Sequence, residues 1–247
     1  MIEFLLLLIA HVLADFYWQP TPWVVDKKEK SFKSRYLYYH VVVVIVTSYV
    51  ILGQWGNPLP AILIGVIHGI IDVIKLTFDK KGSATWFVAD QAAHLITIAI
   101  AAILLTSNIS IGFDTLKTWL YTPKTLSLLS GALLCLSPIS FLVGILTKPW
   151  RDELDKLVPD ANDTLANAGR WIGMSERLLI FVFVVVSQFS AIGFLIAAKS
   201  LLRYNDKSAT GDIPSAYISK KSEYVLVGTL MSYTCAIAVA LVVKLFY

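Results

Sequence analysis

Three histidine and aspartate pairs, each with its members four residues apart, lie inside long apolar stretches of this sequence. The pairs are His11 with Asp15, His68 with Asp72 and Asp90 with His94, and a fourth histidine, His40, opens a further apolar stretch. Residues four apart share one face of an α-helix. An ionisable side chain that faces hydrocarbon costs at least ~2.5 kcal/mol. The shared faces are therefore expected to point toward a polar interior.

The composition of the chain is typical of an integral membrane protein. Hydrophobic residues make up 57% of the sequence and charged residues 15%, and the mean hydropathy is +0.69, which does not fit a soluble domain. Cys135 and Cys235 both lie in apolar runs, where they indicate neither a disulfide nor a cysteine metal site. The first apolar run lacks a preceding basic segment and a cleavage pattern, so it is expected to remain as a span.

Seven apolar stretches approach the length of about 20 residues that a membrane-spanning helix needs. The sequence thus predicts an all-α, polytopic membrane protein with about seven transmembrane helices, at Ile2–Gln19, Tyr36–Gln54, Leu59–Thr77, Ala84–Thr106, Leu126–Thr147, Trp171–Ala198 and Tyr224–Phe246. Residues 1–107 are expected to form a four-helix core with the His/Asp cluster, residues 108–125 an interfacial link, and residues 126–247 a three-helix part. An acidic loop is expected at 148–170.

The distribution of Lys and Arg predicts the orientation. The first loop is rich in both, the second, Gly53–Pro58, has neither, and the third is flanked by Lys75 and Lys80. The positive-inside rule then places the N-terminus outside the membrane and, with seven spans, the C-terminus inside. The basic residues between Lys199 and Lys221 fall on the outer side in this scheme. Either that loop is an exception, or one span in the second half is miscounted.

All seven histidine and aspartate side chains are expected at a similar depth. Counted from the helix ends at the first and third loops, they lie about 6–15 Å from one membrane face, at roughly 1.5 Å of rise per residue. This comparison depends only on which helix ends share a side. The sequence therefore predicts one polar cluster in one half of the membrane.

A set of imidazoles and carboxylates without thiolates is typical of a catalytic site for Zn²⁺, with Mn²⁺ or Fe²⁺ as alternatives. The predicted metal ligands are His11, Asp15, His40, His68, Asp72 and His94. Asp72 is the preferred carboxylate ligand, and Asp90, together with Asp15, is a candidate for the catalytic base. Two alternatives remain open: hydrogen bonds that only hold the helices together, or a proton or ion relay.

A second group of charges opens the sixth apolar stretch. Arg177 is a candidate for binding a lipid headgroup, with Glu176 beside it, because the planar guanidinium binds two phosphate oxygens at once. Lys199 and Arg203, at the other end of the stretch, are expected to extend toward the membrane surface as anchors.

The sequence also resembles a known family. The run His11-x3-Asp15-Phe16-x2-Gln19, then His40, His68-x3-Asp72 and Asp90-Gln91-x2-His94 is similar to an uncharacterised bacterial family of multi-pass membrane proteins described only as a domain of unknown function. In longer members, a C-terminal part resembles the run from Gly169 to Arg177. The resemblance implies no established activity. More distantly, the pattern is similar to inner-membrane proteins described as metal-dependent hydrolases. In the type of site it also resembles ceramidase-like hydrolases, but the His-x3-His pair and the serine of their pattern are absent here.

Two classes of function follow from these features. One is a membrane-embedded metal-dependent hydrolase acting on a lipid-like or membrane-associated substrate. The other is an ion- or proton-coupled transporter that uses the cluster as a relay, which usually has broken helices at the membrane centre. Few proline or glycine breaks occur there, Pro138 among them, and this favours the enzyme. No nucleic-acid partner is expected.

Overall fold

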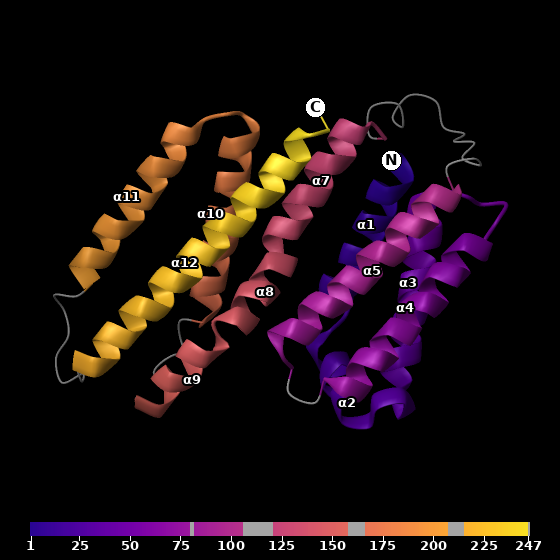
Figure 1. Cartoon of the computed structure of the whole chain (residues 1–247), viewed down its shortest axis with the longest axis horizontal. Helices are drawn as coiled ribbons and strands as arrows, with labels where there is room; N and C mark the ends of the chain where they lie inside the picture. Colours follow the sequence, from indigo (N-terminus) through magenta and orange to yellow (C-terminus); the bar gives the residue numbers. More distant parts are fainter. Residues whose placement is uncertain (80–81, 106–120, 158–165, 207–214, 247) are drawn as a thin grey trace. The chain divides into compact units, whose positions relative to one another are not determined.

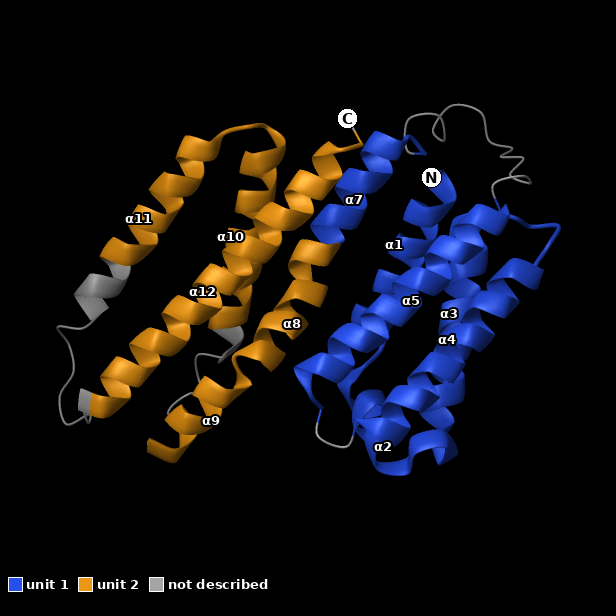
Figure 2. Ribbon diagram, viewed as in Figure 1, with its two compact units in different colours: residues 1–133 blue, residues 134–247 orange. Residues whose placement is uncertain are grey.

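The computed structural model describes residues 1–79, 82–105, 121–157, 166–206 and 215–246, which contain helices and no strand (Figure 1). The chain divides into two compact units, Met1–Leu133 and Leu134–Tyr247 (Figure 2). The expected all-α fold is therefore confirmed for the described residues. The expected interfacial link lies mostly outside them.

Unit 1 is built on a bundle of four long helices. These are α1 (Ile2–Phe16), α3 (Arg35–Leu52), α4 (Leu59–Phe78) and α5 (Ala84–Leu105). In sequence order each helix packs on the next, and α5 packs on α1, so the four enclose a common interior. The short helix α2 (Thr21–Lys30) and the 3₁₀ turn η1 (Ser31–Lys33) lie at the end of the bundle where α1 finishes (Figure 1).

Local sequence signals set the ends of these helices. Pro20 precedes α2, Pro22 lies in its first turn, and α1 and α2 are bent by 80° relative to each other, because a proline cannot continue the hydrogen-bond ladder of α1. The Ser34 hydroxyl caps α3 by accepting a hydrogen bond from the Tyr36 backbone N–H at 3.2 Å. Gly53 ends α3 at a φ of 65°, which glycine adopts without steric cost.

Unit 1 exposes large apolar side chains on its outer surface and buries its polar cluster among apolar side chains. Ile103 and Leu104 are 75% and 72% exposed, whereas His40 is 1% exposed. A bilayer would cover the outer apolar side chains. Among the described residues, five helices are long and apolar enough to cross a membrane, or six if the bent pair of α1 and α2–η1 forms one span. These helices indicate a multi-pass membrane protein.

Unit 2 follows a helix that begins in unit 1, α7 (Pro123–Leu136), and includes its last turn. Its other helices are α8 (Pro138–Leu146), α9 (Lys148–Leu157), α10 (Ala166–Val185), α11 (Phe189–Asp206) and α12 (Ser215–Lys244). Helix α12 packs against α8, α9 and α10, and it is the longest helix of the described chain.

Two expectations for the second half need correction. The expected single span Trp171–Ala198 is two helices, because α10 ends at Val185 and α11 begins at Phe189, with Ser187 at a φ of 60° between them. The seven-span count is thus not confirmed. The expected acidic loop also begins as helix α9, which buries Leu154. The remainder of that loop lies largely outside the described residues.

Candidate metal centre

The structure brings the seven predicted side chains together inside the unit 1 bundle. Helix α1 contributes His11 and Asp15, α3 His40, α4 His68 and Asp72, and α5 Asp90 and His94. The ring centroids of His11 and His94 are 4.9 Å apart, and those of His68 and His94 are 4.1 Å apart. All seven side chains are at most 12% exposed. The helices therefore place one polar cluster in an otherwise apolar interior, while the roles of its members stay predictions.

Two glycines on α4 allow the close approach of α3 and α4. A Cβ atom on Gly65 would lie 2.2 Å from Ile45 Cγ1, and one on Gly69 would lie 2.7 Å from Val41 Cγ2. Such distances are below any van der Waals contact, so a larger residue would force the two helices apart. This close packing holds His40 Nε2 and His68 Nε2 3.0 Å apart.

One carboxylate oxygen lies at the centre of the cluster. Asp15 Oδ1 is 3.4 Å from His40 Nε2 and 3.4 Å from His68 Nε2, and 3.7 Å from His11 Nδ1. It has no hydrogen-bond partner of good geometry among the described residues. Ligands about 2.0–2.1 Å from a tetrahedral metal ion are separated by about 3.3 Å. Asp15 Oδ1, His40 Nε2 and His68 Nε2 lie 3.0–3.4 Å from one another, which matches the spacing of ligands around one metal ion. His11, Asp15, His68 and His94 also offer ligand atoms that lie within 4.8 Å of one another.

A neighbouring amide orients His11 toward Asp15. Gln91 Nε2 donates a hydrogen bond to Asp90 Oδ2 at 3.0 Å, which turns Gln91 Oε1 toward His11 Nε2 at 3.2 Å. Because an amide oxygen only accepts hydrogen bonds, His11 Nε2 is the donor in this contact, and Nδ1 of the same ring lies toward Asp15. Outer hydrogen bonds of this kind fix the tautomer of metal-binding histidines.

Two lysines enter the cluster from the ends of their helices. Lys27, on α2 and only 5% exposed, places its Nζ 2.8 Å from Asp72 Oδ2. Lys75, on α4, places its Nζ 2.7 Å from Asp90 Oδ2. From the sequence, both lysines were expected only as charges of the loops, and their pairing with Asp72 and Asp90 was not predicted. The available signals were the position of Lys75 one turn after Asp72, and the prolines that turn the chain before Lys27.

These ion pairs divide the cluster into two parts. Asp72 and Asp90 each have an ammonium partner, whereas Asp15 faces only imidazoles. This favours Asp15 over Asp72 as the carboxylate ligand of a metal ion. His94, 2% exposed, has no hydrogen-bond partner on either ring nitrogen among the described residues, and its Nε2 lies 3.8 Å from Asp72 Oδ1.

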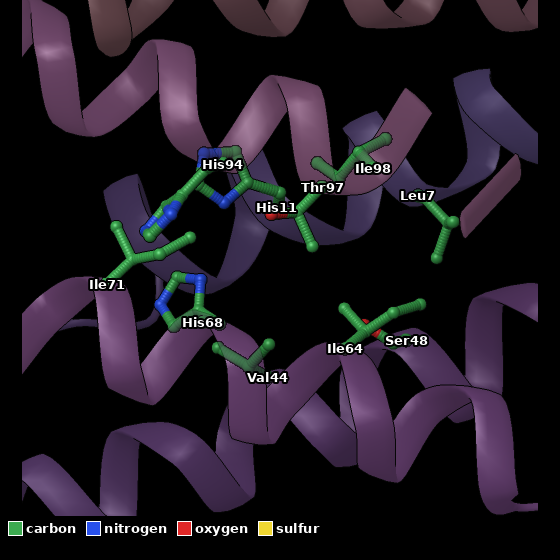
Figure 3. Close-up of a pocket in the computed structure, with 10 residues that line it drawn as sticks. All are labelled: Leu7, His11, Val44, Ser48, Ile64, His68, Ile71, His94, Thr97 and Ile98. Carbon is green, nitrogen blue, oxygen red and sulfur yellow. The ribbon is translucent and has the colours of Figure 1, made fainter. Parts of the chain in front are cut away.

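A small pocket adjoins the cluster (Figure 3). His11, His68 and His94 lie at one end of it, and the other end is mostly apolar, with Leu7, Val44, Ser48, Ile64 and Ile98. The cavity volume is about 20 Å³, which is enough for about one water molecule. These five residues lie farther along their helices from the basic loops than the histidines do, whereas Ile71, which also lines the pocket, lies nearer to them. The pocket therefore extends from the cluster toward the membrane interior.

The charged residues predicted in unit 2 have different surroundings. Arg177, 4% exposed, donates from Nε to the Cys135 carbonyl oxygen at 2.6 Å and from Nη2 to the Leu136 carbonyl oxygen at 3.3 Å. It also hydrogen-bonds to the hydroxyls of Ser140 and Ser232. Glu176 Oε2 pairs with Lys199 Nζ at 2.5 Å. A headgroup role for Arg177 stays a prediction, but most of its donors already have partners.

Comparisons with known proteins point to an uncharacterised family. Residues 3–121 match the family described as "Protein of unknown function (DUF3307)", and this stretch includes every member of the cluster. The match supports the expected family of unknown function for the N-terminal part of the chain. Neither the curated proteins nor the solved structures give a match.

Proposed function

We propose that this protein is a membrane-embedded metal-dependent hydrolase that holds one divalent cation between His11, Asp15, His40 and His68. The observation that supports it is the convergence of three imidazole nitrogens on Asp15 Oδ1, at 3.4, 3.4 and 3.7 Å. Acceptor atoms held this close repel one another unless protons or a cation lie between them. A divalent cation would satisfy all four atoms together.

The charges of the cluster favour this position. Asp72 and Asp90 are already balanced by Lys27 and Lys75, so Asp15 carries the one carboxylate charge of the cluster without an ammonium partner. Three nitrogen ligands and one oxygen ligand without sulfur suit Zn²⁺ first, and Mn²⁺ or Fe²⁺ next. A bound cation of this kind polarises a substrate carbonyl or phosphoryl oxygen and makes a bound water more acidic.

The remaining residues supply proton transfer. His94 lines the pocket, and a free ring nitrogen there is placed to take a proton from the attacking water. Asp72 Oδ1, 3.8 Å from His94 Nε2, would stabilise the imidazolium that forms. Asp90, which the sequence suggested as a base, is held by Lys75 and Gln91 and acts through Gln91 on the orientation of His11.

A lipid-like substrate is the class that fits the surroundings. The pocket reaches the cluster through apolar side chains such as Leu7, Val44 and Ile98, and its position inside a membrane bundle favours an ester, amide or phosphoester that carries an apolar chain. Because the cavity of about 20 Å³ has room for one water and not for a chain, substrate entry requires side chains or helices to move apart.

A proton relay is the second candidate, and one observation favours it. Hydrogen bonds link Lys75 through Asp90 and Gln91 to His11, and His11 Nδ1 lies 3.7 Å from Asp15 Oδ1. Such a series of groups is typical of proton paths in membranes. A relay needs no metal, so metal content separates the two functions.

The test is elemental analysis of the full chain, purified in detergent without added metal. We expect about one transition-metal ion per chain, and loss of that ion in Asp15→Asn, which keeps the shape but removes the charge. Asp152→Asn is the matched control, because Asp152 is an exposed residue of unit 2 paired with Lys148. The metal-loaded protein should hydrolyse fluorogenic ester or phosphoester lipids, and chelation should stop it. A metal-free wild type refutes the hydrolase and leaves the relay.

We also propose a revised topology for the second half. Helices α10 and α11 lie side by side in unit 2, joined at Ser187 (Figure 1). If each crosses the membrane, one crossing is added, and Lys199 and Lys221 fall on the same side as the first loop, as the positive-inside rule requires. The C-terminus then lies outside with the N-terminus.

Fusion proteins and cysteine labelling test this topology. Alkaline phosphatase fused to the C-terminus should be active, and a green fluorescent protein fused there should be dark. The cysteine of a Ser31→Cys variant should resist labelling from outside. The reverse fusion result would restore the original count.

A further inference from the structure

A second group of possible metal ligands lies beside the proposed centre and shares no residue with it. Asp72, Asp90 and His94 each offer one ligand atom, and the three atoms lie within 4.8 Å of one another. Asp90 Oδ1 and both ring nitrogens of His94 are buried and have no hydrogen-bond partner among the described residues. Asp90 and His94 are 5% and 2% exposed. Buried polar atoms without partners are rare and call for an explanation.

Two lysines occupy the other side of the same carboxylates. Lys27 Nζ lies 2.8 Å from Asp72 Oδ2, and Lys75 Nζ lies 2.7 Å from Asp90 Oδ2. Each carboxylate thus contacts an ammonium group with Oδ2, and its Oδ1 takes no part in that ion pair. The two carboxylates and two ammonium groups sum to zero charge. A divalent cation added there would leave two uncompensated positive charges in a medium that screens charge poorly.

We propose that Asp72, Asp90 and His94 form a second divalent-cation site that the ammonium groups of Lys27 and Lys75 keep closed. The protein then holds one ion where its side chains could hold two, as two-metal hydrolytic sites do. This inference depends on the proposed function in one respect, which is that the first ion binds at the centre around Asp15. Closing the second site also keeps His94 available for proton transfer.

The experiment counts Mn²⁺ bound to the full chain in detergent after equilibrium dialysis. Wild type should bind one ion. The double variant Lys27→Met and Lys75→Met, which removes both charges and keeps apolar stems of similar length, should bind two. Adding Asp72→Asn to it should return the count to one. The matched control is the double variant Lys30→Met and Lys33→Met, because Lys30 is an exposed lysine of the same segment that pairs with Asp26. This control should bind one ion.

Electron paramagnetic resonance of the bound Mn²⁺ provides an independent measurement. The double variant should show a spin-coupled pair, and the wild type an isolated ion. If the double variant does not fold, Lys75→Met alone serves, since the Lys75 side chain is 28% exposed and its removal leaves Lys27 on Asp72. It should bind a second Mn²⁺ at least tenfold more tightly than wild type.

Each outcome decides the matter. If the wild type binds one ion, one ion in the lysine variants overturns the inference, and so do two ions in the wild type. No ion in the wild type but one in the double variant refutes the proposed centre at Asp15 and supports the second site. No ion in either protein refutes both.

Discussion

Both units bury charged side chains between apolar helices, but the charged groups around Arg177 in unit 2 have partners, whereas several ionisable atoms of unit 1 have none in the described part of the chain. The Tyr233 hydroxyl of unit 2, which carries no charge, also lacks a hydrogen-bond partner among the described residues. In unit 2, the Arg177 guanidinium donates to two carbonyl oxygens and two hydroxyls, and Glu176 pairs with Lys199. In unit 1, Asp15 Oδ1, Asp90 Oδ1 and both nitrogens of His94 lack hydrogen-bond partners among the described residues. Burying an unpaired polar group costs about 1–3 kcal/mol, so its retention needs a reason other than stability.

The difference suggests how the two groups are used. A network in which the donors and acceptors are matched stabilises one arrangement of the helices and gains nothing from a ligand. A group of acceptors that converge on one point is unfavourable by itself and becomes favourable when a cation binds. In our proposal, Arg177 is therefore a structural contact and the atoms around Asp15 form a binding site.

The largest effect that tests this comparison is expected from Arg177→Met. The Cys135 and Leu136 carbonyls lie at the break between α7 and α8, and Arg177 donates a hydrogen bond to each of them. Its removal should lower the free energy of unfolding by about 3 kcal/mol or more, since buried acceptors lose charged donors. Thermal and SDS-induced unfolding in detergent measure this loss.

Metal content is the control for that variant. Because the proposed ligands all lie in unit 1, the folded fraction of Arg177→Met should keep the wild-type number of ions, opposite to Asp15→Asn. Arg177→Lys should recover only part of the stability, because an ammonium cannot serve several acceptors in a plane. A variant that stays stable but binds fewer ions or less lipid would instead make Arg177 a binding residue.

The sequence predicted the membrane helices of the first half and the convergence of the histidines and aspartates, because helix periodicity and depth depend on local spacing. It could not predict the Lys27–Asp72 pair, which depends on the 80° bend between α1 and α2. It also missed the break at Ser187, although the expected span there was longer than the roughly 20 residues that a bilayer needs. Lys27 and Asp72 are 45 residues apart in the sequence, and local patterns do not show which such residues meet in the fold.

A smaller effect is expected from Gly65→Ala, which tests whether helix spacing sets the geometry of the site. The new Cβ would lie 2.2 Å from Ile45 Cγ1, so α3 and α4 must move apart and separate His40 from His68. We expect the metal affinity to fall by about 10–100-fold, the usual range for changes just outside the ligands. Competition with a chelator measures it.

Two further variants control for the substitution itself. Gly144→Ala, where a Cβ would meet no heavy atom within 4 Å, should leave metal affinity unchanged. Combining Gly65→Ala with Ile45→Ala removes the clashing side chain and should recover part of the affinity. An unchanged affinity in Gly65→Ala would mean that the close approach of α3 and α4 does not position the ligands.

The smallest effect is expected from Gln91→Met, which tests the hydrogen bond between Gln91 and His11. Gln91 accepts from His11 Nε2 at 3.2 Å and donates to Asp90 at 3.0 Å, and Met removes both bonds while keeping the length of the side chain. His11 would then lose the contact that fixes its tautomer, and metal affinity should fall about tenfold with the ion count unchanged. Gln54→Met, near the far end of α3, should have no effect on metal affinity. If Gln91→Met also has none, the orientation of His11 does not depend on its hydrogen bond to Gln91.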